Sequence, residues 1–412
     1  MSHVAGNASR PDGAVAIKVK VLEAVFVDLG LAPLKVRTLD VGDATPPSPG
    51  TSALYGIAKE TQDCVKLAPQ ILNFARAHVA DNGALVVFAV GERTNVELAS
   101  LRNALWPAFH VVALYKTSDT QITRVALDGA RDLGRSSGMR GTALVARPIA
   151  AVFAPEVTVA KFDKNAAGWN RSTGERGSRH FRWMRRYVAE FAGDVPRERV
   201  LDFGCGAGWV GIEACLHTKS RPTLAAFDPS PEMVRIAGEN AAANGLAGRF
   251  IGRTGFGEDP PFPAGNEPLF DLVLSSGVVS FSGELARWYD GLVRTLAPGG
   301  TLVIGDIHRD SIGMRERRVT RPLLPVREMN AQVREDARAE LEKRGLRFDA
   351  WCGYQLSRPL PQLLHVSETR LFGALDPLLV WWNDRASKQE LARGSREPDR
   401  FDSWVMRMRR VK

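Results

Sequence analysis

One short glycine-rich stretch constrains this chain more than any other feature. The run "RVLDFGCGAGWVGIEA", residues 199–214, starts as an apolar strand and continues into a predicted helix. Between the two, Gly204, Gly206 and Gly208 alternate, and glycines at this density let a backbone pass close to a ligand. A cofactor that carries a nucleoside is the usual ligand of such a turn. The same letters also spell the dinucleotide fingerprint G-x-G-x-x-G, ending at Gly211, so the loop alone leaves the cofactor open.

The composition is that of an ordinary globular protein. The length of 412 residues favours two domains over one, and hydrophobic residues make up 44% of the chain. The net charge of +9 favours anionic partners, although an arginine-rich surface explains it as well. The four cysteines include no C-x-x-C pair, so we expect no metal site, no disulfide and a cytoplasmic location. No apolar run reaches the roughly 18 residues of a membrane span, and the first residues lack a signal core.

The order of the predicted elements indicates two α/β domains. Residues 1–15 are expected to form a disordered tail, and residues 16–155 a smaller accessory α/β domain. Over residues 160–412, strands and helices alternate, which predicts a doubly wound, mostly parallel Rossmann-like sheet. One helix–turn–strand pattern of the first domain parallels one in the second. The first domain is therefore either an ordinary αβ unit or a degenerate, partial copy of the second. Because it has no glycine loop, we do not expect it to bind the cofactor.

Residues around and after the loop separate the candidate cofactors. Asp228 ends the next predicted strand, where an acid accepts hydrogen bonds from the ribose hydroxyls of either cofactor. Asp202 lies beside the loop, which suits an amino-bearing or cationic ligand and offers nothing to a pyrophosphate. Ser230 and Met233 follow in "FDPSPEMVRIAGEN", and "FDLVLSS" and "LAPGGTLVIGD" add two further strands. In this ordered set, residues 160–412 resemble the class I S-adenosylmethionine-dependent methyltransferases, in particular the small-molecule group that includes quinone methyltransferases.

The resemblance implies a role for each matching residue. The three glycines would pass the methionine part of S-adenosylmethionine, the acid before them would order its amino-acid end, and the acid of the next strand would bind ribose. The end of the fourth strand would face the point where cofactor and acceptor meet, and a tryptophan in "FDKNAAGWN" would act as a lid. The implied cofactor site consists of Asp202, Gly204, Gly206, Gly208, Asp228, Ser230, Met233, Ser275, Gly277 and Trp169.

The chain departs from the family pattern after the third strand of the second domain. The family usually has an acid there that accepts the adenine amino group, whereas this chain has Gly255 and Phe256. Glu258 and Asp259 come slightly later. Either the loop is shifted, or backbone groups and stacking hold the adenine.

Candidate bases lie just beyond the fifth strand of the second domain. Methyl transfer needs a positioned and desolvated nucleophile, and a hydroxyl nucleophile also needs a base. His308 is the first candidate because ligands of open α/β sheets gather at this edge, and Asp306 is the second. Tyr289 and His180 stand behind them. The plainer explanation of His308 is a histidine in a surface loop.

The acceptor is the least constrained part of the prediction. An arginine-rich insertion after the fifth strand and an aromatic cluster after residue 350 predict a small molecule with an anionic or aromatic group, methylated on oxygen or nitrogen. A core helix explains the aromatic cluster equally well. The alternatives are an RNA or protein methyltransferase and a non-catalytic, cofactor-binding scaffold. The fourth strand ends in Ser-Ser-Gly and lacks the Asn/Asp-Pro-Pro-aromatic tetrad that holds an exocyclic amine. This difference disfavours nucleic acid as the acceptor. A homodimer is favoured, because an incomplete first sheet would leave apolar surface to cover.

Overall fold

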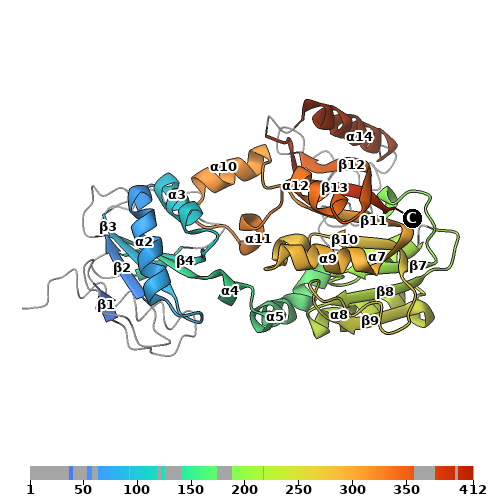
Figure 1. Ribbon diagram of the computed structural model, residues 1–412, viewed down its shortest axis with the longest axis horizontal. Coiled ribbons are helices and arrows are strands. Elements are labelled where there is room, and N and C mark those ends of the chain that lie inside the picture. The colour runs from blue at the N-terminus through green and yellow to red at the C-terminus, as the bar shows by residue number, and fades with distance from the viewer. Residues whose placement is uncertain are drawn as a thin grey trace, which may run out of the picture. The chain divides into compact units, whose positions relative to one another are not determined.

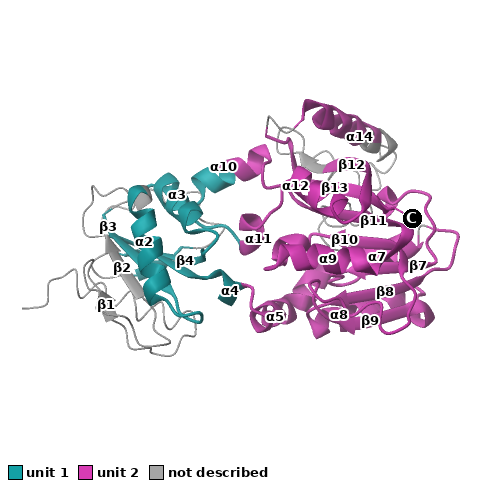
Figure 2. Cartoon of the chain, viewed as in Figure 1, with its two compact units in different colours: residues 1–152, 317–325 teal, residues 153–316, 326–412 magenta. Residues whose placement is uncertain are grey.

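The structure is a computed structural model that describes residues 37–39, 53–57, 64–91, 93–117, 122–125, 141–173, 188–216, 218–356, 376–394 and 398–411. The predicted tail and His180 lie outside these residues. The chain forms two compact units, coloured separately in Figure 2. Unit 1 comprises residues 1–152 and 317–325, and unit 2 comprises residues 153–316 and 326–412. None of the described helices is long and apolar enough to cross a membrane.

Unit 1 is a six-stranded sheet with helices. Its strands follow the order β1-β2-β3-β6-β4-β5, in which the first three are parallel and β6 is antiparallel to both of its neighbours. The elements of this unit are β1 (Arg37–Leu39), β2 (Ala53–Ile57), α2 (Cys64–His78), β3 (Leu85–Val90), α3 (Asn95–Leu105), β4 (Phe109–Thr117), β5 (Ile122–Arg124), β6 (Gly141–Pro148) and α4 (Ile149–Val152).

A short segment from the middle of the sequence completes unit 1. Residues 317–325 belong to this unit although the chain on either side of them belongs to unit 2, which the sequence pattern did not indicate. Leu323 is buried in the core cluster formed by α2, α3 and the sheet. The buried Arg102 of α3 donates hydrogen bonds to the backbone carbonyls of Arg318 and Arg321. The insertion after the fifth strand is thus partly built into the accessory unit.

Unit 2 has the predicted doubly wound sheet. Its strands follow the order β12-β13-β11-β10-β7-β8-β9, parallel from β11 to β9, with β13 antiparallel to β11 and to β12 (Figure 1). The predicted fold class is therefore confirmed. The elements are α5 (Pro155–Thr173), β7 (Arg199–Phe203), α7 (Trp209–Leu216), β8 (Thr223–Asp228), α8 (Pro231–Ala243), β9 (Phe250–Thr254), β10 (Phe270–Ser276), α9 (Leu285–Thr295), β11 (Leu296–Ile307), α10 (Ile312–Thr320, shared with unit 1), α11 (Val326–Met329), α12 (Arg334–Glu342), β12 (Leu346–Leu356), α14 (Asp376–Arg393) and β13 (Phe401–Arg410).

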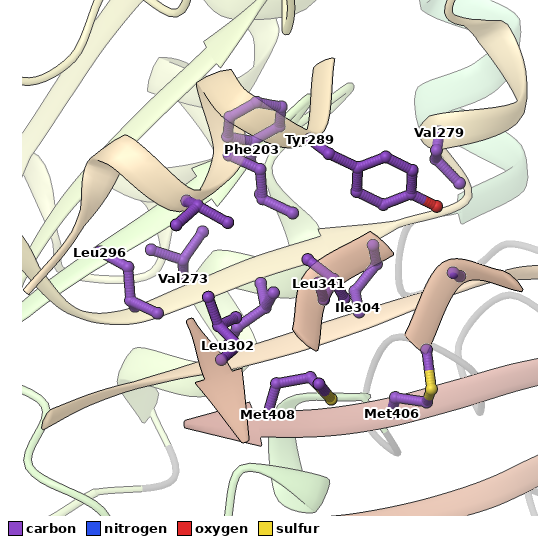
Figure 3. Packing of buried hydrophobic residues seen from close by; sticks show 14 of the residues in the cluster. Phe203, Val273, Val279, Tyr289, Leu296, Leu302, Ile304, Leu341, Met406 and Met408 are labelled. Atoms are coloured by element: carbon purple, nitrogen blue, oxygen red, sulfur yellow. The ribbon is translucent and has the colours of Figure 1, made fainter. Parts of the chain in front are cut away.

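Alternation along the central strands gives the sheet two apolar faces. On one face Phe203 and Val273 pack with α9 and α12, in the cluster that Figure 3 shows around Tyr289 and Leu341. On the other face the intervening residues of the same strands, such as Val200, pack with α7 and α8. Successive side chains of a strand point to opposite faces of the sheet. The position of a residue in this alternation therefore decides which helix layer its side chain faces.

The two sheets share part of their strand order. In unit 1 the order β2-β3-β6-β4 has one parallel pair followed by two antiparallel pairs. In unit 2 the order β10-β11-β13-β12 has the same succession of directions, with the last strand of the sequence inserted between the other two. This agreement goes further than the helix–turn–strand similarity in the sequence, because it concerns four adjacent strands in each sheet.

Candidate cofactor and acceptor site

The glycine loop connects β7 to α7, and its glycines are required by close packing. Gly204 has φ +74°, and a Cβ there would lie 2.6 Å from Cγ1 of Val278, which follows β10. Gly208 has φ +81°, and a Cβ there would lie 2.9 Å from the Cβ of Ala237 in α8. The loop therefore holds a left-handed backbone against two neighbouring segments, which only glycine permits without strain.

Asp202 braces the helix that follows the loop. The alternation of β7 directs its side chain to the face covered by α7, where it is 2% exposed. Its Oδ2 accepts a hydrogen bond from the N–H of Gly211 at 2.9 Å. Burial and, to a smaller extent, the nearby Asp228 raise the pKa of Asp202 to about 7, against the opposing effect of the Gly211 hydrogen bond. In this geometry the carboxylate stabilises the first turn of α7.

Asp228 links the end of β8 to the glycine loop. Its Oδ2 accepts the N–H of Gly206 at 2.9 Å, and its Oδ1 accepts the N–H of Ser230 at 3.0 Å. Burial raises the pKa of Asp228 to about 6, although the two backbone hydrogen bonds act in the opposite direction. Each carboxylate oxygen accepts one backbone donor and keeps a further lone pair. A rigid carboxylate with spare acceptor capacity at the end of the second strand fits the ribose of S-adenosylmethionine.

Ser230 and Met233 form the start of α8. Ser230 is the N-cap, and its Oγ accepts the N–H of Met233 at 3.1 Å. The same hydroxyl donates a hydrogen bond to Asp163 of α5. Met233 is fully buried in a small cluster beneath the loop. The structure places these two residues at the start of the helix after β8, their role toward the cofactor stays a prediction, and Asp163 is a contact that the sequence reasoning missed.

Helix α5 lies along the glycine loop. Phe162, Ala166 and Trp169 recur at helical spacing and pack with Ala207 and with buried residues of α8. A Cβ at Gly206 would lie 3.1 Å from Nε1 of Trp169, which places that ring directly against the loop. The sequence analysis predicted only a lid tryptophan in this region, without a helix. The spacing of the three apolar residues is the signal that would have identified the helix.

The end of β10 is tied to the strands beside it. Ser275 is 1% exposed, and its Oγ has no hydrogen-bond partner among the described residues. Gly277 has φ +72°, and its N–H donates to the carbonyl of Gly305 at 2.7 Å. Asn330, just after α11, donates from Nδ2 to the carbonyls of Ser280 and Ser282. The loop after β10 is therefore held from two sides.

Asp306 organises the loop after β10. Its Oδ2 accepts the N–H of Ser280 at 3.0 Å, and its Oδ1 accepts the N–H of Ile307 at 2.7 Å and Nη2 of Arg327 at 3.3 Å. The residue is 4% exposed. With three donors on a buried carboxylate, Asp306 is suited to positioning the loop more than to taking a proton from an acceptor.

His308 is a buried residue, in contrast to the surface histidine that its loop position suggested. It is 2% exposed, its Nδ1 accepts the N–H of Asp310 at 3.1 Å, and its Nε2 lies 3.5 Å from Oδ2 of Asp399. Burial and, to a smaller extent, the cation of Arg334 lower its pKa to about 4. The imidazole is thus a neutral group enclosed by its own loop and by the start of β13. The assignment of His308 or Asp306 as a base stays a prediction, and this geometry favours positioning roles for both.

The remaining candidates divide between core and surface. Tyr289 and Trp351 are buried in the core cluster of unit 2, and Trp351 packs against Phe401 with ring centroids 5.8 Å apart. Glu258 accepts a hydrogen bond from the hydroxyl of Ser282, and Asp259 forms an ion pair with Arg294. Trp351, at least, contributes to the fold and not to a cover over the acceptor.

Comparison with known proteins agrees with this geometry. A family model described as a methyltransferase domain matches residues 200–300. The ajmaline N-methyltransferase of Rauvolfia serpentina is 34% identical over 33% of this chain and 48% of its own length. The nocamycin O-methyltransferase of Saccharothrix syringae is 32% identical over 31% of this chain and 44% of its own length. This chain thus spans about half or less of these two relatives.

A solved structure of phosphoethanolamine N-methyltransferase 2 from Haemonchus contortus, in complex with S-adenosyl-L-methionine, is 14% identical. The match covers 88% of this chain and 85% of that one, with a TM-score of 0.40. Unit 2 therefore contains a match to a methyltransferase domain, in agreement with the predicted resemblance to the class I S-adenosylmethionine-dependent methyltransferases.

Proposed function

We propose that this protein transfers a methyl group from S-adenosylmethionine to the oxygen or nitrogen of a small-molecule acceptor. When bound, the cofactor supplies a sulfonium methyl group: a lone pair of the acceptor forms the new bond to carbon, the C–S electron pair returns to sulfur to give S-adenosylhomocysteine, and the acceptor loses a proton. Support comes from relatives named for small-molecule N- and O-methylation. The observation that carries the proposal is Asp228, fixed at the end of β8 by the N–H groups of Gly206 and Ser230.

In this proposal different residues of unit 2 bind different parts of the cofactor and the acceptor. Gly204, Gly206 and Gly208 form the turn along the methionine part of the cofactor, and Asp228 binds the ribose. Asp202 holds the turn by bracing α7, in place of direct contact with the amino-acid end. Met233 and Trp169 enclose the site from α8 and α5. Ser275 and Gly277 lie at the edge of the sheet where the acceptor would meet the methyl group.

The experiment that tests the activity is a screen with labelled methyl donor. The purified full-length protein is incubated with a metabolite extract and labelled S-adenosylmethionine, and labelled products are identified by mass spectrometry. We expect label in small molecules, lost with the Asp228→Ala variant. Label found only in RNA or protein would favour the alternative function. Absence of transfer in every fraction, together with intact cofactor binding, would favour a scaffold.

The accessory unit is proposed to shape the acceptor site or to mediate assembly as a homodimer. It shares the strand order of one edge of unit 2, and its sequence contains no glycine loop. A cytoplasmic location is part of the same proposal, because Cys205, Cys215 and Cys352 are free and buried. Light scattering on the full chain should give the mass of a dimer. A strict monomer at micromolar concentration would remove the assembly role.

A further inference from the structure

Two cations flank one aromatic ring near the carboxyl ends of β10 and β11 in unit 2. Nζ of Lys161, from α5, lies 5.1 Å from the ring centroid of Phe281, in the loop after β10. The guanidinium carbon of Arg327, from α11, lies 5.7 Å from the same centroid. Phe162 meets Phe281 edge to face at 5.1 Å and lies 5.4 Å from Nζ of Lys161. Segments far apart in the sequence thus bring two positive charges to one place.

This place adjoins the ends of the two central strands. A Cβ at Gly277, just after β10, would lie 3.0 Å from Nη2 of Arg327. The same nitrogen donates to Asp306 near the end of β11. Ligands of open, parallel sheets bind beyond these carboxyl ends. Helix α5 carries both Lys161 and Trp169, and Trp169 lies against the glycine loop. One helix therefore connects the cation pair to the loop.

The positive charge here is not balanced by the surrounding carboxylates. Asp306 is the single ion-pair partner of Arg327 among the described residues, and it also accepts two backbone N–H groups. Lys161 forms no ion pair with a described carboxylate. Burial lowers the pKa of Lys161, and repulsion by Arg327 lowers it further. In addition, Nε of Arg327 is buried without a hydrogen-bond partner in the part of the chain that the structure describes. Arg327, whose side chain is 25% exposed, and the more exposed Lys161 repel each other and have spare donors, an arrangement typical of an oxyanion site.

We propose that Lys161 and Arg327 bind an oxyanion, a carboxylate or phosphate group, that the methyl acceptor carries. The inference rests on the proposed function and names the acceptor class for that site. The acceptor would be an anionic molecule with a hydroxyl or amine at the other end, held so that this end faces Gly277. A purely structural cation–π arrangement would need no ligand, and a site for the cofactor's own carboxylate would bind the cofactor instead. The experiment separates these possibilities.

The test measures inorganic phosphate binding to the full-length protein by ³¹P NMR, with and without saturating S-adenosylhomocysteine. Lys161→Gln and Arg327→Gln should each weaken phosphate binding by at least about 10-fold, because each removes a charge-assisted contact. Lys164→Gln removes the same charge from the next turn of α5, at a residue that makes no cation–π contact with Phe281 among the described residues, and should change phosphate binding less than about 2-fold. S-adenosylhomocysteine affinity, measured by calorimetry, should stay within about 3-fold in all three variants.

Each contrary result overturns a definite part of the proposal. Phosphate binding unchanged in Lys161→Gln, which breaks no ion pair and should fold, would mean that the cations serve only the fold. Equal losses in Lys161→Gln and Lys164→Gln would mean non-specific attraction. A large loss of S-adenosylhomocysteine affinity would assign the cations to the cofactor. Failure of the proposed function would appear separately, as wild-type protein that binds no S-adenosylhomocysteine, and the titration without that compound would still report on the oxyanion site.

Discussion

The two halves of the candidate site are built differently. The cofactor half consists of the loop after β7 and the end of β8. The acceptor half consists of the ends of β10 and β11 together with α5 and α11. Backbone N–H groups, buried carboxylates and tight glycine contacts hold the cofactor half. Long cationic side chains on helices from distant parts of the chain make the acceptor half. Substitutions in the first half should therefore damage the fold and cofactor binding together. Substitutions of Lys161 or Arg327 in the second half should change acceptor binding alone.

The largest effect is expected from Gly204→Ala. The new Cβ would need both a left-handed backbone and space already occupied by Val278, at a combined cost of about 2–5 kcal/mol. Gly245→Ala is the matched control, because Gly245 has φ +76° but nothing within 4 Å of the added Cβ, so about 1–2 kcal/mol is expected. Thermal unfolding and S-adenosylhomocysteine affinity are measured for both. Equal losses in the two variants would mean that the close approach at Gly204 is unimportant.

Asp228→Ala should lower S-adenosylhomocysteine affinity by at least about 10-fold, since hydrogen bonds to a charged acceptor contribute roughly 1.5–3 kcal/mol each. Glu258→Ala serves as the comparison in the neighbouring loop. Its side chain is engaged with Ser282, and its loss should matter less. Calorimetry at constant pH gives both affinities. An Asp228→Ala affinity equal to that of the wild type would mean that another residue binds the ribose.

Stability and cofactor binding should respond to pH in opposite directions. Burial raises the pKa of Asp228 to about 6 and that of Asp202 to about 7, so the folded state holds protons that the unfolded chain releases. The stability contributed by these groups is complete below their ordinary pKa of about 4 and is lost as pH rises through 6 and 7. Ribose binding needs ionised Asp228, so affinity should be about 10-fold weaker at pH 5 than at pH 8. A flat affinity profile would contradict this, and Asp228→Asn should produce one.

His308→Gln should have the smallest catalytic effect. If the buried imidazole positions its loop against Asp310 and Asp399, this variant should lower the melting temperature and leave kcat within about 3-fold. A true base would instead contribute about 100-fold or more to kcat. A fall of that size at an unchanged melting temperature would restore His308 as the base and indicate a hydroxyl acceptor.

The two halves also differ in how far the sequence predicts them. The cofactor half can be predicted from local sequence patterns. A strand, the alternating glycines after it and an acid at the end of the next strand lie at short, characteristic spacings along the chain. The alternation of β7 also decides that Asp202 faces α7, although the resemblance suggested the cofactor instead. The acceptor half depends on tertiary contacts among α5, α11 and the loop after β10, and no local pattern brings Lys161 to Phe281. The burial of His308 was not predicted, because its position in a loop does not indicate which residues pack over it.

One measurement tests the central claim most directly: titration of the full-length protein with S-adenosylhomocysteine by calorimetry. The site built on the loop after β7 lies in unit 2, and the sequence of unit 1 has no counterpart of that loop. We therefore expect one molecule bound per chain, with binding weakened by Asp228→Ala. A stoichiometry of two per chain, or binding that is unchanged in this variant, would contradict the account.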